Sequence, residues 1–282
     1  MLRAPRAKSR GEGGRYVRVM ISGPIGVFDS GVGGLSVLLE IRRELPDEDV
    51  LYVADSGHAP YGEKPAGFIE QRAIAIVDFF IEQGAKAIVV ACNTATGVAI
   101  EALRARWTVP IVGIEPAIKP AAATTKSGVI GVLATTQMIA APRFARLAEA
   151  FGSGVEIVAQ ACPGLVEQIE KGELTTEQTQ SLVRKYVQPL IDRGADTLVL
   201  GCTHYPFVRP LVESVAGSNV TIIDPSAAVA REVRKRLTQD GLLTQQHGRE
   251  SAVTFWTSGT PDQLRGMIRT LGIEAEAVHS LP

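Results

Sequence analysis

The sequence is poor in cysteine and has no excess of charge of either sign. Three cysteines occur in 282 residues, so one must stay unpaired and a framework of disulfide bonds is excluded. The formal net charge of -1 at pH 7 gives no reason to expect a nucleic-acid surface or an anionic membrane partner. We therefore expect free thiols, a cytoplasmic protein and no nucleic-acid partner.

Long hydrophobic runs are also missing. The longest aliphatic stretches, such as "AIVVA" and "TLVLG", are far shorter than a membrane span, so no membrane partner is expected. The composition is instead 45% hydrophobic and 21% charged, which is typical of a globular protein with a proper core. The length allows one large domain or two ordinary ones.

The first twenty residues differ from the rest of the chain. They contain one acid, Glu12, and six basic residues: Arg3, Arg6, Lys8, Arg10, Arg15 and Arg18. This stretch lacks the apolar core of a secretory signal. A transit peptide and a basic regulatory arm are the functional alternatives. The interpretation that the composition favours is a disordered basic extension over residues 1–22, upstream of a second possible start at Met20.

Beyond the extension, short aliphatic strands alternate with helical stretches. Strands are predicted at 24–31, 49–55, 87–93, 110–116, 128–136, 155–162, 197–203, 220–226 and finally 252–259, and helices at 33–45, 68–84 and 176–193. Parallel sheets that are covered by helices on both faces have such nearly continuous Val, Ile and Leu strands. The predicted fold class is α/β.

One strand pattern occurs twice. "GAKAIVVACNTATG" begins at Gly84 and "GADTLVLGCTHYPF" at Gly194, and each reaches a cysteine at its ninth position. Each copy follows an opening strand, "IGVFDSG" or "IGVLATT". We predict two similar α/β domains related by a pseudo-twofold axis, one formed by residues 23–115 plus 225–282 and the other by residues 116–224.

The two repeated cysteines are the candidate catalytic residues. Ligands bind beyond the carboxyl ends of strands in open parallel sheets, and Cys92 and Cys202 directly follow their aliphatic runs. If the domains face each other, both thiols line one cleft. Two opposed thiols suit the inversion of an acidic C–H centre, because one thiolate removes the proton from one face and the other thiol delivers a proton to the opposite face.

Polar residues beside the cysteines are candidates for stabilising the carbanion and binding the substrate. They are Asn93 and Thr94 after the first cysteine, and Thr203 and His204 after the second. His204 could also keep Cys202 ionised or shuttle its proton. Asp29 and Ser30 close the first strand, where they can bind the substrate ammonium group and attend Cys92.

Other motifs and residues give weaker indications of a functional site. A cysteine that ends an aliphatic strand is usually a small buried residue, and this is the interpretation for Cys162, which has no polar neighbours of the required kind. "DSGVGG" does not match a nucleotide-binding spacing. A zinc site is disfavoured because no Cys-x-x-Cys occurs and the four histidines are scattered. His58 is interpreted as a loop residue near the cleft.

Four motifs together resemble the glutamate racemase family, within the aspartate/glutamate racemase superfamily. They are "GVFDSGVGGLSV", "YVADSGHAPYGEK", "ACNTAT" and "GCTHYP", and the resemblance covers about residues 24 to 275. It implies two α/β domains, Cys92 and Cys202 as the acid/base pair, and Asp29 and His204 as their assistants. The substrate-binding residues it implies are Asp29, Ser30, Tyr61, Gly62, Asn93, Thr94, Thr203 and His204; Tyr61 and Gly62 come from the resemblance alone.

The same resemblance implies racemisation of L- and D-glutamate without a cofactor or a metal, a role in peptidoglycan synthesis, and a homodimer. "SGHAPYG" and "CPGLVEQIEKGEL" depart from the family pattern. The part that residues 167–170 play in the wall of the site is therefore not predicted. An aspartate or hydantoin racemase would use the same cysteine pair, although His204 after "GCT" favours glutamate. A thiol redox protein would need cysteines close in sequence. A binding module would keep its ligand affinity without either thiol.

Overall fold

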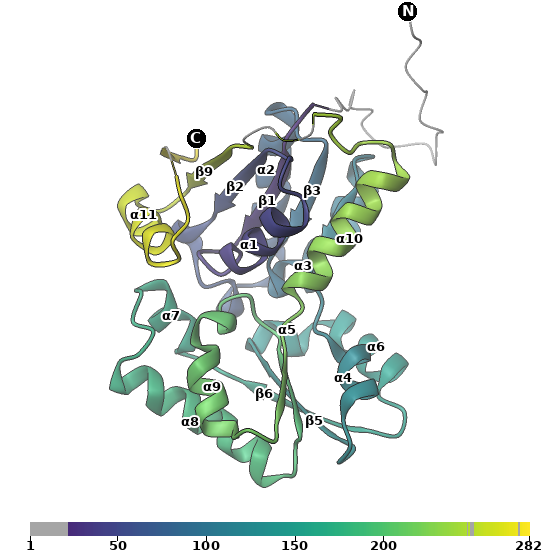
Figure 1. Cartoon of the computed structure of the whole chain (residues 1–282), viewed down its shortest axis with the longest axis vertical. Helices are drawn as coiled ribbons and strands as arrows, with labels where there is room; N and C mark the ends of the chain where they lie inside the picture. The colour runs from purple at the N-terminus through teal and green to yellow at the C-terminus, as the bar shows by residue number, and fades with distance from the viewer. Residues whose placement is uncertain (1–21, 247, 249–250, 276) are drawn as a thin grey trace, which may run out of the picture.

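The computed structural model describes residues 22–246, 248, 251–275 and 277–282. The predicted basic extension therefore lies outside the described residues, apart from Ser22. The described chain forms two lobes, one above the other in Figure 1, and each lobe is built on one sheet.

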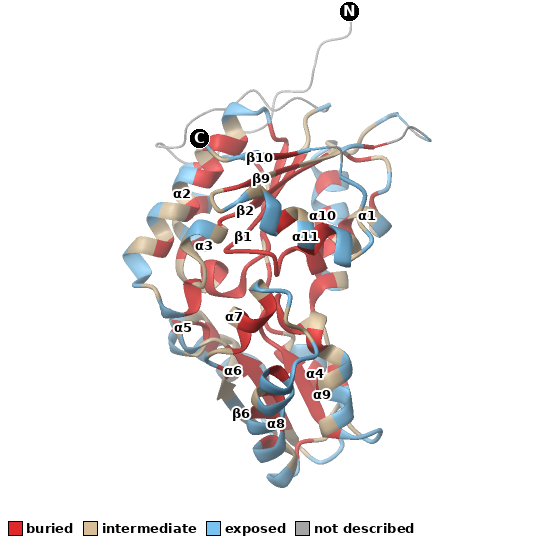
Figure 2. Cartoon of the chain, turned by 90° about the vertical axis from the view of Figure 1, so that its left-hand side faces the viewer, coloured by how far each residue is buried: buried red, intermediate tan, exposed pale blue. Residues whose placement is uncertain are grey.

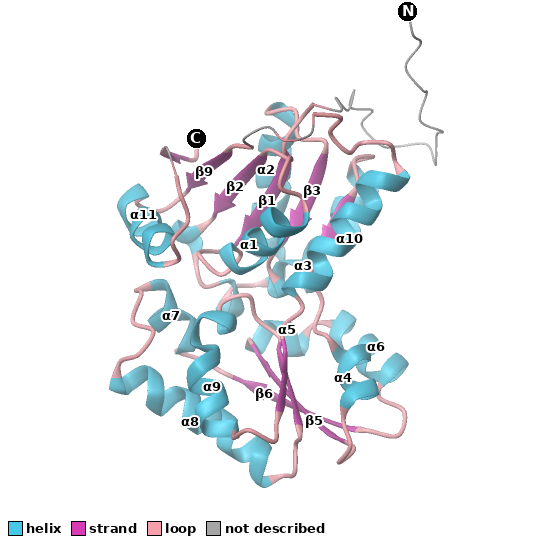
Figure 3. Ribbon diagram, viewed as in Figure 1, coloured by secondary structure: helices cyan, strands magenta, loops and turns pink. Residues whose placement is uncertain are grey.

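Every strand pair in both sheets is parallel. The first sheet has the order β10-β9-β2-β1-β3-β4 and the second β6-β5-β7-β8. The strands are β1 (Ile25–Asp29), β2 (Val50–Ala54), β3 (Ala87–Val90), β4 (Ile111–Gly113), β5 (Val129–Ala134), β6 (Glu156–Ala161), β7 (Thr197–Leu200), β8 (Thr221–Ile223), β9 (Val253–Thr257) and β10 (Val278–Ser280). With the covering helices, these sheets confirm the predicted α/β class (Figure 3).

Helices cover both faces of each sheet. They are α1 (Leu35–Glu44), α2 (Ala66–Glu82), α3 (Asn93–Arg106), α4 (Ile118–Thr124), α5 (Thr136–Ala140), α6 (Pro142–Phe151), α7 (Leu165–Glu170), α8 (Glu177–Asp192), α9 (Arg209–Ala216), α10 (Ser226–Gln239) and α11 (Pro261–Thr270), with 3-10 turns η1 (Ser56–His58), η2 (Tyr61–Glu63) and η3 (Tyr205–Val208). Within the described residues, no helix combines the length and the apolar character that crossing a membrane needs.

Alternating side chains of each strand enter different cores. In β1, Val27 packs in the core that contains α1 and α10, whereas the next residue, Phe28, packs in the core that contains α2 and α3. In β5, Leu133 joins the core of α7, α8 and α9, and Val132 joins that of α4, α5 and α6. Burial on both faces explains why the strands read as continuous aliphatic runs.

The two lobes repeat a strand order. The second strand of each lobe lies beside the first, followed by the third and the fourth: β2-β1-β3-β4 and β6-β5-β7-β8. Register repeats as well, because Gly26 pairs with Ile88 and Gly131 pairs with Leu198. The duplication read from the sequence is therefore present in the topology.

The repeated Gly-Ala pair ends a helix in the same way in both lobes. The glycine after each helix has a positive φ, +76° at Gly84 and +92° at Gly194, which glycine adopts without the usual steric penalty. The next N–H group then bonds back to a carbonyl of the last helical turn, from Ala85 to Phe80 (2.9 Å) and from Ala195 to Leu190 (3.0 Å). This is a Schellman motif. It turns each chain directly into its cysteine strand.

A glycine in each opening strand makes room for the same helix position. A Cβ at Gly26 would lie 2.7 Å from the Phe80 ring, and one at Gly131 would lie 2.8 Å from Leu190 Cδ1. Phe80 and Leu190 each lie four residues before their Gly-Ala pair. The shared Ile-Gly-Val sequence thus reflects a shared approach of helix to sheet.

Each predicted strand and helix overlaps an observed one, and the structure adds strand β10 and helices α3–α7 and α9–α11, which were not predicted individually. Helix α8 runs from Glu177 to Asp192, and Thr176 caps its first turn, close to the predicted span of 176–193. Strand β10 was not predicted, because "VHS" is short and two of its three residues are exposed. The domain boundaries expected near 115/116 and 224/225 fall in the linkers between β4 and α4 and between β8 and α10, and we propose these linkers as the boundaries.

Figure 2 shows buried chain both in the sheets and where the lobes meet.

Candidate active site

Both repeated cysteines lie just beyond the carboxyl end of a central strand. Cys92 follows β3 and caps the N-terminus of α3, and Cys202 follows β7. Each of these strands lies beside the opening strand of its lobe, β1 or β5. The opening strands end in Asp29–Ser30 and Ala134–Thr135, so these pairs lie next to the cysteines.

The two thiols line one cavity between the lobes. Its empty volume is about 260 Å³, and its lining residues are Ser30, Pro60, Tyr61, Gly62, Cys92, Asn93, Thr94, Thr135, Val166, Cys202, Thr203 and His204. Every sequence-predicted site residue except Asp29 lines this cavity. Residues from η2 and from the ends of β1, β3, β5 and β7 thus converge, although they are spread over the chain from Ser30 to His204.

Cys92 lies in a buried, weakly polar environment. Its Sγ accepts a hydrogen bond from the N–H of Ala95 (3.5 Å), and its thiol donates to Ser30 Oγ (3.7 Å). Burial raises the pKa of this thiol well above its ordinary value, and the charge of Asp29 raises it further. The thiol is therefore the favoured form when no substrate is bound.

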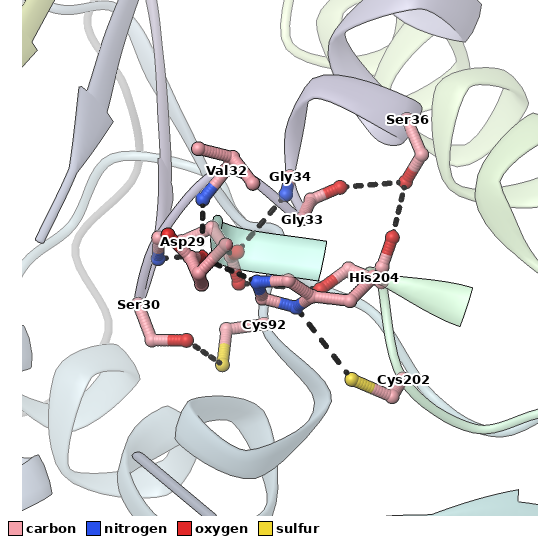
Figure 4. A network of polar contacts seen from close by, with 12 residues as sticks. Asp29, Ser30, Val32, Gly33, Gly34, Ser36, Cys92, Cys202 and His204 are labelled. Atoms are coloured by element: carbon pink, nitrogen blue, oxygen red, sulfur yellow. Dashed lines mark hydrogen bonds and ion pairs between the residues drawn. The ribbon is translucent and has the colours of Figure 1, made fainter. Parts of the chain in front are cut away.

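Asp29 lies behind the cavity rather than in its lining. It is fully buried, and its Oδ2 accepts hydrogen bonds from the N–H groups of Gly34 (2.9 Å) and Gly31 (3.3 Å). Thr203, from the other lobe, donates to Oδ1 at 3.3 Å. Burial raises the pKa of Asp29 above its ordinary value, which suits a carboxyl group that exchanges a proton. Figure 4 shows Asp29 close to Ser30 and Cys92.

Cys202 is paired with an imidazole that is itself held by a carboxylate. His204 Nδ1 lies 3.7 Å from Cys202 Sγ (Figure 4), and His204 Nε2 lies 2.5 Å from Glu170 Oε1. Burial by itself would lower the pKa of His204, but Cys202 and Glu170 outweigh it and hold the pKa well above the ordinary value. Glu170 Oε1 also accepts the N–H of Val32 at 2.8 Å, so this chain of contacts joins the two lobes.

Sequence reasoning missed Glu170 and Thr135. Glu170 lies in the stretch 167–170 that was left open, and it contacts His204, whereas Glu167 lines a neighbouring cavity. Nothing local to α7 indicates this contact. Thr135 could have been found, because it aligns with Ser30 in the repeat of "IGVFDS" and "IGVLAT". Its Oγ1 lies 2.9 Å from Thr94 Oγ1.

Asn93 carries an amide group with free hydrogen-bonding capacity. Its side chain is buried, and within the described part of the chain neither amide atom has a hydrogen-bond partner. Burying unpaired polar atoms is costly, so this amide is suited to a polar ligand in the cavity. Around the site, the described residues contain no group of three or more His, Cys, Asp or Glu that could hold a metal ion.

The third cysteine is separate from this arrangement. Cys162 is buried in the core, as predicted, and its thiol donates to the Gln160 carbonyl at 3.4 Å. Burial raises its pKa to about 12, which keeps it protonated and unreactive. His58 lies in η1 with its Nδ1 3.0 Å from Asp55 Oδ1, and it does not line the cavity.

A family model described as Asp/Glu/Hydantoin racemase matches residues 25–233. The chain belongs to this racemase family. The resemblance drawn from the four motifs is thereby confirmed, and so is the expected enzyme class, a racemase. The matched region includes the second lobe, the part of the first lobe that precedes residue 234, and every residue of the site described above.

Individual relatives agree with this membership. A glutamate racemase of Methylococcus capsulatus is 55% identical over 256 residues, which cover 91% of this chain and 93% of the relative. A solved glutamate racemase of Bacillus anthracis superposes with a TM-score of 0.85 at 32% identity, covering 93% of this chain and 98% of that one. A solved Escherichia coli glutamate racemase, in complex with L-glutamate and the activator UDP-MurNAc-Ala, has a TM-score of 0.80 at 32% identity and covers 92% and 98%.

Proposed function

We propose that this racemase interconverts L- and D-glutamate by a two-thiol mechanism. The observation that carries the proposal is that Cys92 and Cys202, one from each lobe, line the same cavity. The relatives named above are glutamate racemases, and the Escherichia coli relative was solved with L-glutamate bound. These likenesses support glutamate as the substrate.

The reaction needs two proton transfers and no electron transfer. A thiolate on one face takes the α-proton, the electron pair of the C–H bond stays on the α-carbon, and the thiol on the other face donates its proton to that carbon. The first residue ends as a thiol and the second as a thiolate, so the enzyme is left ready for the reverse reaction. By resemblance, Cys92 deprotonates D-glutamate and Cys202 deprotonates L-glutamate.

Cys92 is converted to its thiolate with the help of its surroundings. Its burial raises the pKa, so the free energy of ionisation must come from elsewhere in the site. The N-terminus of α3 favours negative charge at Cys92, through the Ala95 N–H and the helix dipole. Asp29 assists as the buried carboxyl group beside this thiol.

Cys202 is served by a different assistant. His204 with a raised pKa is an imidazolium that stabilises a thiolate at Cys202 and can return a proton to it. Glu170 orients the ring through Nε2. We therefore assign Asp29 to the Cys92 side and the His204–Glu170 pair to the Cys202 side.

The polar lining binds the amino acid and stabilises the carbanion. The free amide of Asn93 can both donate and accept, and the hydroxyl-bearing residues Ser30, Thr94 and Thr203 line the same cavity. The Tyr61–Gly62 turn completes the binding set. Pre-aimed donors in a buried site are the principal means of stabilising such a negative charge.

The proposal also includes the compartment, the oligomeric state, the cofactor requirement and the biological role of the enzyme. The resemblance to the glutamate racemase family supports a cytoplasmic homodimer that needs no cofactor and supplies D-glutamate for peptidoglycan. None of the proton transfers described above requires a metal ion or an electron carrier.

The proposal is tested by incubating the purified protein with L-glutamate in D2O without added cofactor. We expect optical rotation to decay to zero, and the α-proton signal to disappear from the NMR spectrum at a matching rate. Retention of optical rotation with L-glutamate, together with decay for L-aspartate, would assign the chain to a different substrate in the family. Retention with both amino acids would refute the proposal.

A further inference from the structure

The turn η2 forms a wall of the cavity and also contacts the opposite lobe. Tyr61 and Gly62 belong to the first lobe and are buried. A Cβ at Gly62 would lie 2.9 Å from Thr135 Cβ, in the second lobe. A displacement of this turn would therefore change both the shape of the cavity and the contact across it.

A buried carboxylate outside the cavity holds this turn. Asp55 follows β2 and is fully buried, and its Oδ2 accepts a hydrogen bond from the Tyr61 hydroxyl at 2.5 Å. The guanidinium of Arg72, in α2, donates to the same carboxylate through Nε (3.0 Å) and Nη2 (2.7 Å). Neither Asp55 nor Arg72 lines the cavity.

The charges of this cluster fix which group donates to which. Burial would raise the pKa of Asp55, but the hydrogen bonds from Arg72 and Tyr61 lower it below its ordinary value. Burial and the Asp55 charge raise the pKa of Tyr61. Asp55 is therefore a carboxylate that only accepts, and Tyr61 is a phenol that donates. Arg72 compensates the buried charge with a two-pronged ion pair, the geometry that makes such pairs strong and directional.

Two further residues, His58 and Ser258, lie on the outer side of Asp55. His58 Nδ1 lies 3.0 Å from Asp55 Oδ1 and 3.5 Å from Ser258 Oγ, beyond the end of β9. Side chains from α2, from η1 and from the segment after β9, which is distant in sequence, therefore gather around Asp55, the carboxylate that holds Tyr61. The side chain of Arg72 is 24% exposed, whereas that of Asp55 is 0% exposed.

We propose that Asp55 and Arg72 are positioning residues for the racemase reaction, acting through Tyr61 to fix the Tyr61–Gly62 turn in its substrate-binding position. This inference rests on the proposed function and deepens it. Because Asp55 and Arg72 do not line the cavity, their loss weakens the binding of both enantiomers and leaves proton transfer largely intact.

The test uses the full-length protein with Arg72→Met, Arg72→Lys and Tyr61→Phe, and steady-state kinetics in both directions. We expect Arg72→Met and Tyr61→Phe to raise KM for L- and D-glutamate roughly tenfold, the worth of one hydrogen bond to a charged group, with kcat within about threefold. Arg72→Lys keeps the charge but not the two-pronged contact, and should recover part of the loss. The double variant Arg72→Met/Tyr61→Phe should lose no more than the worse single variant, because both changes break one chain of contacts.

Arg106→Met is the matched control. Arg106 pairs with Asp78 across α3 and α2 at 3.4 Å, with side chains 42% and 33% exposed, and its replacement should leave KM unchanged. A lower melting temperature for the Arg72 and Tyr61 variants with unchanged KM would overturn the inference and leave a structural role. If Arg72→Met does not fold, Arg72→Lys and Tyr61→Phe decide by the same criterion.

A wild-type protein that does not racemise glutamate would overturn the proposed function and this inference together. An active wild type with unaffected variants would overturn the inference alone.

Discussion

The two lobes have the same strand order and the same helix-ending motif before the cysteine, but they differ in the residues that assist each thiol. In the first lobe the opening strand ends in Asp29, and in the second the equivalent residue is Ala134. After the cysteine, the first lobe has Thr94 where the second has His204. The backbone positions of the thiols were repeated, and the acid/base chemistry around them was not.

The residues that assist the two thiols also depend on contacts across the lobes. Asp29 of the first lobe receives a hydrogen bond from Thr203 of the second, and Glu170 of the second lobe receives one from the N–H of Val32 in the first. Each assisting carboxyl group is thus held partly by the opposite lobe. A site of this kind requires both lobes in place, so the repeat yields one active site rather than two.

Loss of either thiol should have the largest effect. We expect Cys92→Ser and Cys202→Ser each to reduce kcat for racemisation by about 10³-fold or more, because the hydroxyl group of serine is a far weaker acid than a thiol. Both directions must lose the same factor in kcat/KM, since the two enantiomers have equal free energies. Circular dichroism at a fixed wavelength measures both rates. An activity within tenfold of wild type in either variant would exclude the two-thiol mechanism.

The assistants should differ by lobe, with smaller losses. A substrate that eliminates after α-proton removal reports each base separately. For the enantiomers of 3-chloroglutamate, whose β-chloride leaves after deprotonation, Asp29→Asn should slow the D-form and His204→Asn the L-form, each by about 10²-fold. Chloride release measures both. Equal losses for both enantiomers in each variant would contradict the assignment of one assistant to each thiol.

Neutralising the neighbouring carboxyl group should lower one pKa on each side, with different consequences for the charge of the two groups. The charge of Asp29 raises the pKa of Cys92, so Asp29→Asn should lower it and shift the pH dependence of iodoacetamide alkylation at Cys92 to lower pH. Glu170 raises the pKa of His204, so Glu170→Gln should lower that pKa in a histidine NMR titration, and the imidazolium is then lost at lower pH. An unchanged His204 titration would show that Glu170 does not control the ring.

The structural part of the repeat predicts matched stability losses. Gly26→Ala and Gly131→Ala would each place a methyl group within 2.8 Å of a helix side chain, the Phe80 ring and Leu190 Cδ1 respectively. We expect each to reduce the free energy of unfolding by about 1–3 kcal/mol, while the KM of the folded enzyme changes little. Urea unfolding followed by circular dichroism measures the losses. A loss at only one glycine would show that the two helix–sheet contacts are not equivalent.

Treatments that remove metal ions or carbonyl cofactors should have no effect on the rate of racemisation. Dialysis against EDTA and treatment with hydroxylamine should leave the rate of racemisation unchanged, because proton transfer between thiols and the α-carbon needs neither a metal ion nor a carbonyl cofactor. The rate is measured by polarimetry before and after treatment. Loss of activity that is restored by adding a metal ion or pyridoxal phosphate would require a different mechanism.

The sequence predicts the fold and the thiols well for a physical reason. Strands buried on both faces must be aliphatic, and a helix that turns sharply into such a strand needs glycine at a positive φ, so β3 and β7 and their cysteines could be located from the chain alone. Asp29 was found because it closes the opening strand β1, and His204 because it follows the second cysteine. Glu170 was not found, because its role depends on the tertiary contact of α7 with His204.

The contacts that hold Tyr61 could not be predicted from the sequence for the same reason. "YVADSGHAPYGEK" contains Asp55, but nothing local indicates that this carboxylate is turned toward Arg72 in α2 rather than toward the cavity. The pairing of Asp29 with Ala54 in the β1–β2 register explains it. Asp55 is one residue further along, and successive side chains of a strand point to opposite faces.

The most direct test of the account is the elimination reaction in the two serine variants. Removing chloride from 3-chloroglutamate requires a base on one face only, and the acid on the far face is dispensable. If the lobes supply opposite faces, Cys202→Ser should still release chloride from the D-form and not from the L-form, and Cys92→Ser should show the reverse preference. Loss of both enantiomers to the same extent in both variants would contradict the assignment of one face to each lobe, even with both cysteines essential for racemisation.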